Sequence, residues 1–343
     1  MGGLLGFWRG TGAGAVSRQR RLATSIGYSP YIRVFAFDDG FGTAFLDPMT
    51  PLPGAVFGIA YHPSDLTVAV AHNNAPHVSV YAWSESGFGV KYADPSVPLP
   101  AGGGRSVAFS PSGDDVVIGH AGTPFISAYA FSESGFGVKY ADPSVLPGNL
   151  AANRVAFSPS GRDLAVAHPG TPCLTAYPWG PGFGPKYADP VTLPTDEGMG
   201  VAFSPSGNTL AVAFASAPHV HAYAWSEAGF GIKHADPFVA IPGTGLDVAF
   251  SPPAGGALAV AHDGSPYISA YSWESGFGTR YADPSTPPPG ACLAAAFSFS
   301  GTELAVKHFN FPNIAAYSWG PGFGTKYPYA TTGISSSTAI AFI

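Results

Sequence analysis

The sequence predicts an all-β fold, a seven-bladed β-propeller of four-stranded blades, and three observations carry this prediction. Two sequence markers each recur seven times at one period, each period holds four short strand-like runs, and the two chain ends hold complementary parts of one repeat. Of the 343 residues, 45 are glycine, 35 are proline, 46% are hydrophobic and only 10% are charged. Many short strands joined by tight turns explain this composition, and a helical protein does not.

The two markers define the length of the repeat. The first is a Gly-Phe-Gly triplet, whose phenylalanine recurs at intervals of 46 to 48 residues. The second is an aromatic residue, usually within Val-Ala-Phe-Ser-Pro-Ser-Gly, at close to the same period. The first marker lies at Phe41, Phe88, Phe136, Phe183, Phe230, Phe277 and Phe323, and the second at Tyr61, Phe109, Phe157, Phe203, Phe250, Phe297 and Phe342.

Residues 106–142 show the strands of one repeat. Runs rich in β-branched or aromatic residues cover 106–110, 115–120, 125–131 and 136–141, and Gly, Pro or Ser bounds each of them. Four strands in about 47 residues are typical of a propeller blade.

The two ends of the chain predict how the ring closes. Residues 22–45 match strands two to four of a repeat, and residues 337–343 match only a first strand. Together they make one blade, so we expect the last strand to complete the first blade. This closure removes exposed sheet edges and sets the number of blades at seven.

Charge and composition exclude several classes of protein. The net charge is −6, and Lys and Arg do not gather on one stretch of the repeats, so we expect no nucleic acid partner. No apolar run approaches the 18 residues of a membrane span, and the apolar start is too short for a signal peptide, so we expect no membrane association and no secretion signal. Two cysteines, Cys173 and Cys292, cannot form a disulfide framework.

Three sets of residues recur regularly, and we interpret each as structural. Five histidines occupy one position at the end of the second strand; because they share a strand face with apolar residues, we expect them to form hydrogen bonds with a nearby loop rather than bind a metal. Asp-Pro pairs after the fourth strand are expected to form turns, and basic residues on that outermost strand to discourage sheet aggregation or contact an acidic partner. The sets are His72, His120, His168, His262 and His308; Asp47, Asp94, Asp142, Asp189, Asp236 and Asp283; and Lys91, Lys139, Lys186, Lys233, Arg280 and Lys326.

Two regions vary between repeats and form a candidate binding face. One is the residue after the proline of the loop between the second and third strands; the other is the connection between blades, such as 193–200. In propellers both loops lie at one end of the ring, although unconstrained loops also vary without binding anything. The loop residues are Tyr31, His77, Phe125, Cys173, His219, Tyr267 and Asn313.

Residues 1–21 belong to no repeat and are predicted to form an N-terminal anchoring arm, with the propeller covering 22–343. The segment combines an apolar cluster, a Gly-rich run and several arginines, which fits docking into an assembly; a disordered tail is the alternative. The residues predicted to bind a partner are Leu4, Leu5, Phe7, Trp8, Arg9, Arg18, Arg20 and Arg21.

The repeats resemble two kinds of known protein. The Ser-Pro-Ser-Gly turn, the aromatic end of the third strand and the split closing blade look like WD-repeat propellers, although the Gly-His and Trp-Asp dipeptides are missing from their usual places. A second resemblance is to repeats in tailed-bacteriophage proteins. It rests on the motif Gly-Phe-Gly-(Thr/Val)-Lys-Tyr-Ala-Asp-Pro together with Ala-Val-Ala-His and Ala-Tyr-x-Trp. This resemblance implies a virion component of the tail, a fibre or a decoration assembly.

The sequence contains no catalytic or phosphate-binding motif, so the lead expectation is a non-enzymatic protein without metal or cofactor. It would be a structural or adhesion component of a phage virion, anchored to other virion proteins by its arm and displayed toward a host receptor or glycan. The alternatives are a soluble bacterial scaffold or carbohydrate-binding propeller, and, less favoured, a lactonase-like enzyme with a metal in the channel.

Overall fold

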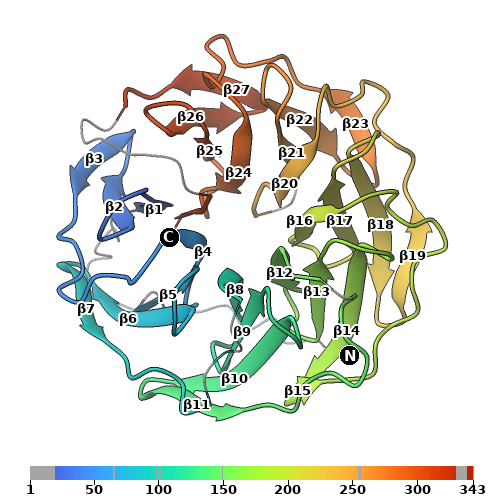
Figure 1. Ribbon diagram of the computed structural model, residues 1–343. Coiled ribbons are helices and arrows are strands. Elements are labelled where there is room, and N and C mark those ends of the chain that lie inside the picture. Colours follow the sequence, from blue (N-terminus) through green and yellow to red (C-terminus); the bar gives the residue numbers. More distant parts are fainter. Residues whose placement is uncertain are drawn as a thin grey trace, which may run out of the picture.

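The computed structural model describes residues 20–342, apart from 65, 98, 100–101, 149, 254–255 and 330–337. Seven four-stranded antiparallel sheets surround a central axis, with one strand of each sheet innermost and one on the outer rim (Figure 1). The predicted all-β, seven-bladed propeller is therefore confirmed.

The strands of each blade follow one another from the axis to the rim. Blade 1 holds β28 (Ile340–Phe342), β1 (Arg21–Ser25), β2 (Ile32–Phe37) and β3 (Phe41–Ala44); blade 2 holds β4 (Val56–Tyr61), β5 (Thr67–His72), β6 (Val78–Ser84) and β7 (Gly87–Lys91); blade 3 holds β8 (Gly104–Phe109), β9 (Asp115–His120), β10 (Ile126–Ser132) and β11 (Gly135–Lys139). Blade 4 holds β12 (Arg154–Phe157), β13 (Asp163–Ala167), β14 (Leu174–Gly180) and β15 (Gly182–Phe183); blade 5 holds β16 (Gly198–Phe203), β17 (Thr209–Phe214), β18 (Val220–Ser226) and β19 (Gly229–Lys233). Blade 6 holds β20 (Gly245–Phe250), β21 (Ala257–His262), β22 (Ile268–Trp273) and β23 (Phe277–Arg280); blade 7 holds β24 (Cys292–Phe297), β25 (Glu303–His308), β26 (Ile314–Gly320) and β27 (Gly322–Lys326).

The last strand closes the ring as the sequence predicts. β28 pairs antiparallel with β1, with Ala341 opposite Ala23. The ring of Phe342 packs edge-on against Phe37 of the same blade at 5.2 Å between centroids. Blade 1 therefore contains the two ends of the described chain. Ring closure depends on pairing between residues that are more than 300 positions apart in the sequence.

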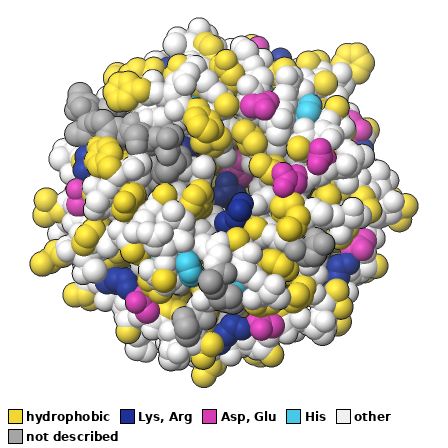
Figure 2. Space-filling view, viewed as in Figure 1, with side chains coloured by type: hydrophobic (Ala, Val, Ile, Leu, Met, Phe, Trp, Pro, Cys, Tyr) yellow, Lys and Arg dark blue, Asp and Glu magenta, His cyan; other side chains and the backbone are white. Residues whose placement is uncertain are grey.

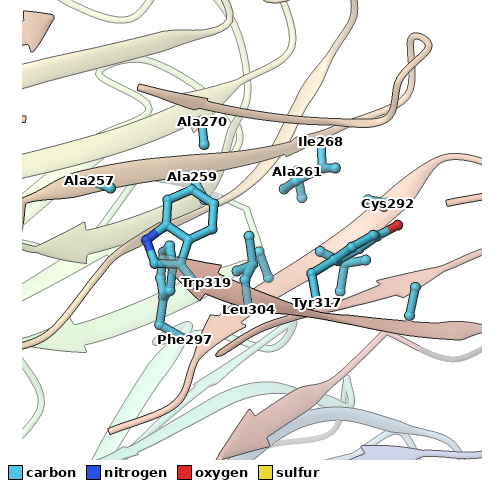
Figure 3. Packing of buried hydrophobic residues seen from close by; sticks show 13 residues of the cluster. Ala257, Ala259, Ala261, Ile268, Ala270, Cys292, Phe297, Leu304, Tyr317 and Trp319 are labelled. Carbon is cyan, nitrogen blue, oxygen red and sulfur yellow. The ribbon is translucent and has the colours of Figure 1, made fainter. Parts of the chain in front are cut away.

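The hydrophobic core lies in the seams between neighbouring blades. At the seam of blades 6 and 7, Trp319 and Tyr317 pack with Phe297 and Leu304 against alanines of β21 (Figure 3). The Trp319 and Phe297 rings meet edge-on at 5.2 Å. Small residues on one blade facing large ones on the next let the sheets approach closely, and the repeat places the same arrangement at the other seams.

Most members of the regular polar sets have partners within the fold, although the histidines bond mainly to the third strand rather than to the expected loop, and no hydrogen bond is found for either ring nitrogen of His308. Four of the strand-end histidines place Nε2 within 2.9–3.0 Å of a hydroxyl seven residues later, as His72 does with Ser79. Burial lowers the pKa of His72 to about 4, so the ring is neutral at physiological pH. Five of the six Asp-Pro carboxylates form ion pairs with the basic residue three positions earlier, as Asp236 does with Lys233, whereas Asp47 pairs with Arg33.

Candidate functional site

The innermost strands place one residue from each blade around the entrance of the axial channel. These seven residues, which we call the mouth ring, all lie four positions before the second aromatic marker and line one cavity of about 220 Å³. They are Phe57, Arg105, Asn153, Met199, Leu246, Leu293 and Thr338. Because each strand begins at the channel in the same register, equivalent positions of distant repeats meet there.

A second cavity of about 200 Å³ continues from the mouth ring. It is lined by the residues one and two positions further along the innermost strands, including Ser106, Arg154 and Asp247 among valines and isoleucines. Figure 2 shows Lys and Arg side chains in the hollow at the centre of the ring, with acidic side chains beside them. Among the described residues that line the two cavities, the charged ones are Arg105, Arg154 and Asp247.

An ion pair crosses the channel wall between blades that are not neighbours. Nη2 of Arg154 in blade 4 lies 3.2 Å from Oδ2 of Asp247 in blade 6. The equivalent residue of the intervening blade 5 is Gly200, and a Cβ there would lie 2.6 Å from Cα and 2.7 Å from Oδ1 of Asp247. The glycine therefore provides the space in which the carboxylate sits.

The Asp247 carboxylate is buried but has compensating partners. The residue is 7% exposed, and the amide of Ala295 donates a hydrogen bond to Oδ2 at 3.2 Å. Burial raises the pKa of the Asp247 carboxyl above its ordinary value, while Arg154 and the amides of Ala295 and Val248 oppose this effect. The result is a carboxylate with increased basicity beside a guanidinium, which is a combination suited to acid–base chemistry.

A second polar pair lies in the mouth ring itself. Nη1 of Arg105 donates to Oδ1 of Asn153 at 3.2 Å, and Nδ2 of Asn153 donates to the carbonyl of Gly198 at 2.9 Å. These bonds orient the Asn153 amide and hold the exposed Arg105 guanidinium at the channel entrance. The channel thus carries two guanidiniums and one carboxylate.

The structure gives the seven predicted loop residues a local role. Each has a left-handed backbone, with φ between 66° and 74°, which is uncommon for residues other than glycine. His77, Phe125, Cys173 and Asn313 are buried, and the others are partly buried. Nδ2 of Asn313, for example, donates to the carbonyl of Phe309 at 2.7 Å within its own loop. Contact between these residues and a partner stays a prediction.

The predicted arm is described only at its end. Leu4, Leu5, Phe7, Trp8, Arg9 and Arg18 lie outside the described residues. Arg20 pairs with Glu303 of blade 7 and donates to the carbonyl of Asp38 at 2.6 Å. Arg21 is the first residue of β1, and its guanidinium lies 5.6 Å from the Trp83 ring centre. Arg20 and Arg21 therefore contact the propeller, and their assignment to a separate arm is corrected.

Sequence reasoning missed Arg105, Asn153, Arg154 and Asp247. The available signal was variation at the third and fourth positions before the aromatic marker, where other repeats carry glycine, alanine or apolar residues. The two regions chosen from variability were loops, while these positions lie at the start of the innermost strand. Strand residues are usually explained by packing, and only the ring shows that these face a channel.

Two further properties of the described part of the chain bear on function. No group of three or more His, Cys, Asp or Glu side chains suited to holding a metal ion is found there. The same residues contain no helix of the length and apolar character needed to cross a membrane.

Comparison with known proteins identifies the fold. No protein-family model matches this sequence, and no curated protein matches it. Among solved structures, two proteins with the provisional name 6-phosphogluconolactonase are similar: one from Bacteroides uniformis (TM-score 0.70, 15% identity, covering 95% of this chain and 99% of the other) and one from Bacteroides fragilis (0.70, 13%, 97% and 100%). The periplasmic gluconolactonase of Pseudomonas aeruginosa is also similar (0.66, 16%, 94% and 99%). At these identities the likeness establishes the fold alone.

These findings correct the functional expectation from the sequence. These three similar propellers carry lactonase names, which contradicts the expectation of a non-enzymatic phage virion component. The WD-repeat and phage resemblances, and a location in the virion, receive no support from the comparisons. The repeated sequence that suggested them lies on the second and third strands of the blades, as in β21 and β18, and on the outer strands, as in β7.

Proposed function

We propose that this protein is a lactone hydrolase whose reaction takes place in the axial channel. The single observation that carries the proposal is the Arg154–Asp247 pair, with a buried carboxylate of raised pKa beside a guanidinium. The lactonase names of propellers with the same fold along their whole length support the choice of reaction class. The function expected from the sequence, that of a non-enzymatic protein, assigned no role to these channel residues.

The geometry supports a direct hydrolytic mechanism. Asp247 accepts a proton from a water molecule as the water oxygen attacks the lactone carbonyl carbon. Arg154 donates hydrogen bonds to the carbonyl oxygen as it gains negative charge. The ring C–O bond then breaks, the leaving oxygen takes the proton from Asp247, and the product is an open hydroxy acid. No step requires a metal ion.

The proposal is tested by following proton release from lactones in weakly buffered solution. The substrates are glucono-1,5-lactone, 6-phosphogluconolactone and γ-octalactone, each corrected for spontaneous hydrolysis. We expect acceleration of at least one substrate, and Asp247→Asn to lower it about 100-fold or more because the base is removed. The rate should rise with pH as the Asp247 carboxyl loses its proton.

A matched control separates catalysis from general damage. Asp189→Asn makes the same chemical change at an exposed carboxylate that follows the outer strand of blade 4, where it pairs with Lys186. This variant should keep the wild-type rate. Absence of acceleration with all three lactones, or equal effects of the two substitutions, would refute the proposed function.

A further inference from the structure

The mouth ring has separate polar and apolar sides. In blade order, Arg105 and Asn153 occupy blades 3 and 4, and Met199, Leu246 and Leu293 follow on blades 5, 6 and 7. All five are at least partly exposed in the cavity. Arg154 of blade 4 also lines this cavity, so a ligand at the entrance meets two guanidiniums and an amide on one side and a continuous apolar wall on the other.

This division favours one class of ligand. A carboxylate suits Arg105, because a guanidinium forms paired, charge-assisted hydrogen bonds with carboxylate oxygens. The apolar wall cannot donate to or accept from hydroxyl groups, and burying a hydroxyl without a partner is unfavourable. A polyhydroxylated sugar acid would place several hydroxyls against Met199, Leu246 and Leu293.

We infer that the channel binds an amphiphilic carboxylate, namely the hydroxy acid released from a lactone with an aliphatic substituent, with its carboxylate at Arg105 and its chain on the apolar wall. The inference rests on the proposed function for the step that forms this acid. The mouth cavity has a volume of about 220 Å³, roughly seven times the 30 Å³ that a water molecule occupies in the liquid, which is enough for a short aliphatic chain.

Binding is measured separately from hydrolysis, by titration calorimetry of the full chain. The probes are octanoate, gluconate and octan-1-ol. Octanoate and gluconate have the same charge but an aliphatic or a polyhydroxylated chain, whereas octanoate and octan-1-ol have the same aliphatic chain length but differ in charge. We expect octanoate to bind at least tenfold more tightly than gluconate or octanol. Arg105→Met should weaken octanoate binding about tenfold and leave octanol unchanged, because it removes the charge and keeps the stem.

Two further variants complete the test. Leu246→Asn should weaken octanoate binding several-fold without weakening that of gluconate, because it places a polar group in the apolar wall. Arg162→Met is the control: this exposed arginine pairs with Glu227 at the opposite end of the strands and should bind all probes as the wild type does.

The outcomes distinguish this inference from the proposed function. Gluconate binding as tightly as octanoate, or octanoate binding unaffected by both Arg105→Met and Leu246→Asn, overturns the inference, whether or not lactones are hydrolysed. Octanoate binding as expected, with no accelerated hydrolysis of any of the three lactones, supports the binding assignment and overturns the hydrolase proposal.

Discussion

A buried lysine at the closing seam allows the sharpest test of how this ring is stabilised. Lys307 on β25 is fully buried, and its Nζ donates to the carbonyl of Ser25 in blade 1 at 3.0 Å. The equivalent residue is Ser25 in blade 1, and in the remaining blades it is alanine or glycine, as at Ala71 and Gly119. We expect Lys307→Met, which keeps the side-chain volume and removes the amine, to stabilise the protein at neutral and acidic pH.

The magnitude follows from the pKa of the lysine. Desolvation lowers the pKa of Lys307 from 10.5 to about 7 in the folded protein. The unfolded chain therefore binds more protons between pH 7 and 10.5, and the wild-type free energy of unfolding rises with pH across this window. A difference of about 3.5 pH units corresponds to about 5 kcal/mol, and loss of the Ser25 hydrogen bond offsets about 1 kcal/mol of it.

The assay is thermal unfolding followed by circular dichroism between pH 6 and 10.5. A gain of about 4 kcal/mol corresponds to an increase in Tm of roughly 6 °C for a chain of this size. The increase should be largest near pH 6 and should fall to zero or slightly below it near pH 10.5, where the wild-type lysine is neutral in the folded state and half protonated in the unfolded state. Lys91→Met, at a partly buried lysine on the outer strand that pairs with Asp94, is the control and should change Tm little.

The reasoning would be refuted by a Lys307→Met variant that is less stable than the wild type at pH 6. It would also be refuted by a gain in Tm that stays constant with pH, because a constant gain reports packing rather than the cost of the buried charge. Either result would show that the lysine is better accommodated at the seam of blades 7 and 1 than its burial indicates.

Two other perturbations test the channel and the closure. Gly200→Ala should lower the rate of lactone hydrolysis at least tenfold and displace the pH–rate profile, because the new Cβ collides with Asp247. Gly180→Ala is its control, because a Cβ there meets nothing within 4 Å. Both rates are measured by proton release. Deletion of residues 337–343 should lower Tm by several degrees and cause self-association, read by size-exclusion chromatography, because it exposes the edge of β1. Wild-type stability of the truncated chain would show that β28 does not hold the ring closed.

The fold was predictable from the sequence because the information is local and repeated. Each blade has its own turn residues and its own strands. Each also has a tryptophan or phenylalanine near the end of the third strand, which is Trp179 in blade 4. The division of blade 1 between residues 22–45 and the C-terminus was also visible, because repeat phase can be read without coordinates. Strand ends moved by one or two residues: β8 begins at Gly104 rather than at residue 106.

The candidate site was not predictable in the same way. Arg154 and Asp247 are 93 residues apart, and a whole blade separates the two blades that carry them. No local sequence motif therefore links them. Their contact depends on closure of the ring, on the glycine at position 200 between them and on the direction in which each innermost strand meets the axis.

The sequence by itself determined the number of blades and the place of closure, because both follow from the count and the phase of one repeat. The tertiary structure alone decided which of the variable positions face the channel and which side chain is forced into the closing seam. The physical reason is that a ring converts equivalent positions of distant repeats into neighbours. An arginine, an aspartate and a lysine then acquire burial and partners that no single repeat contains.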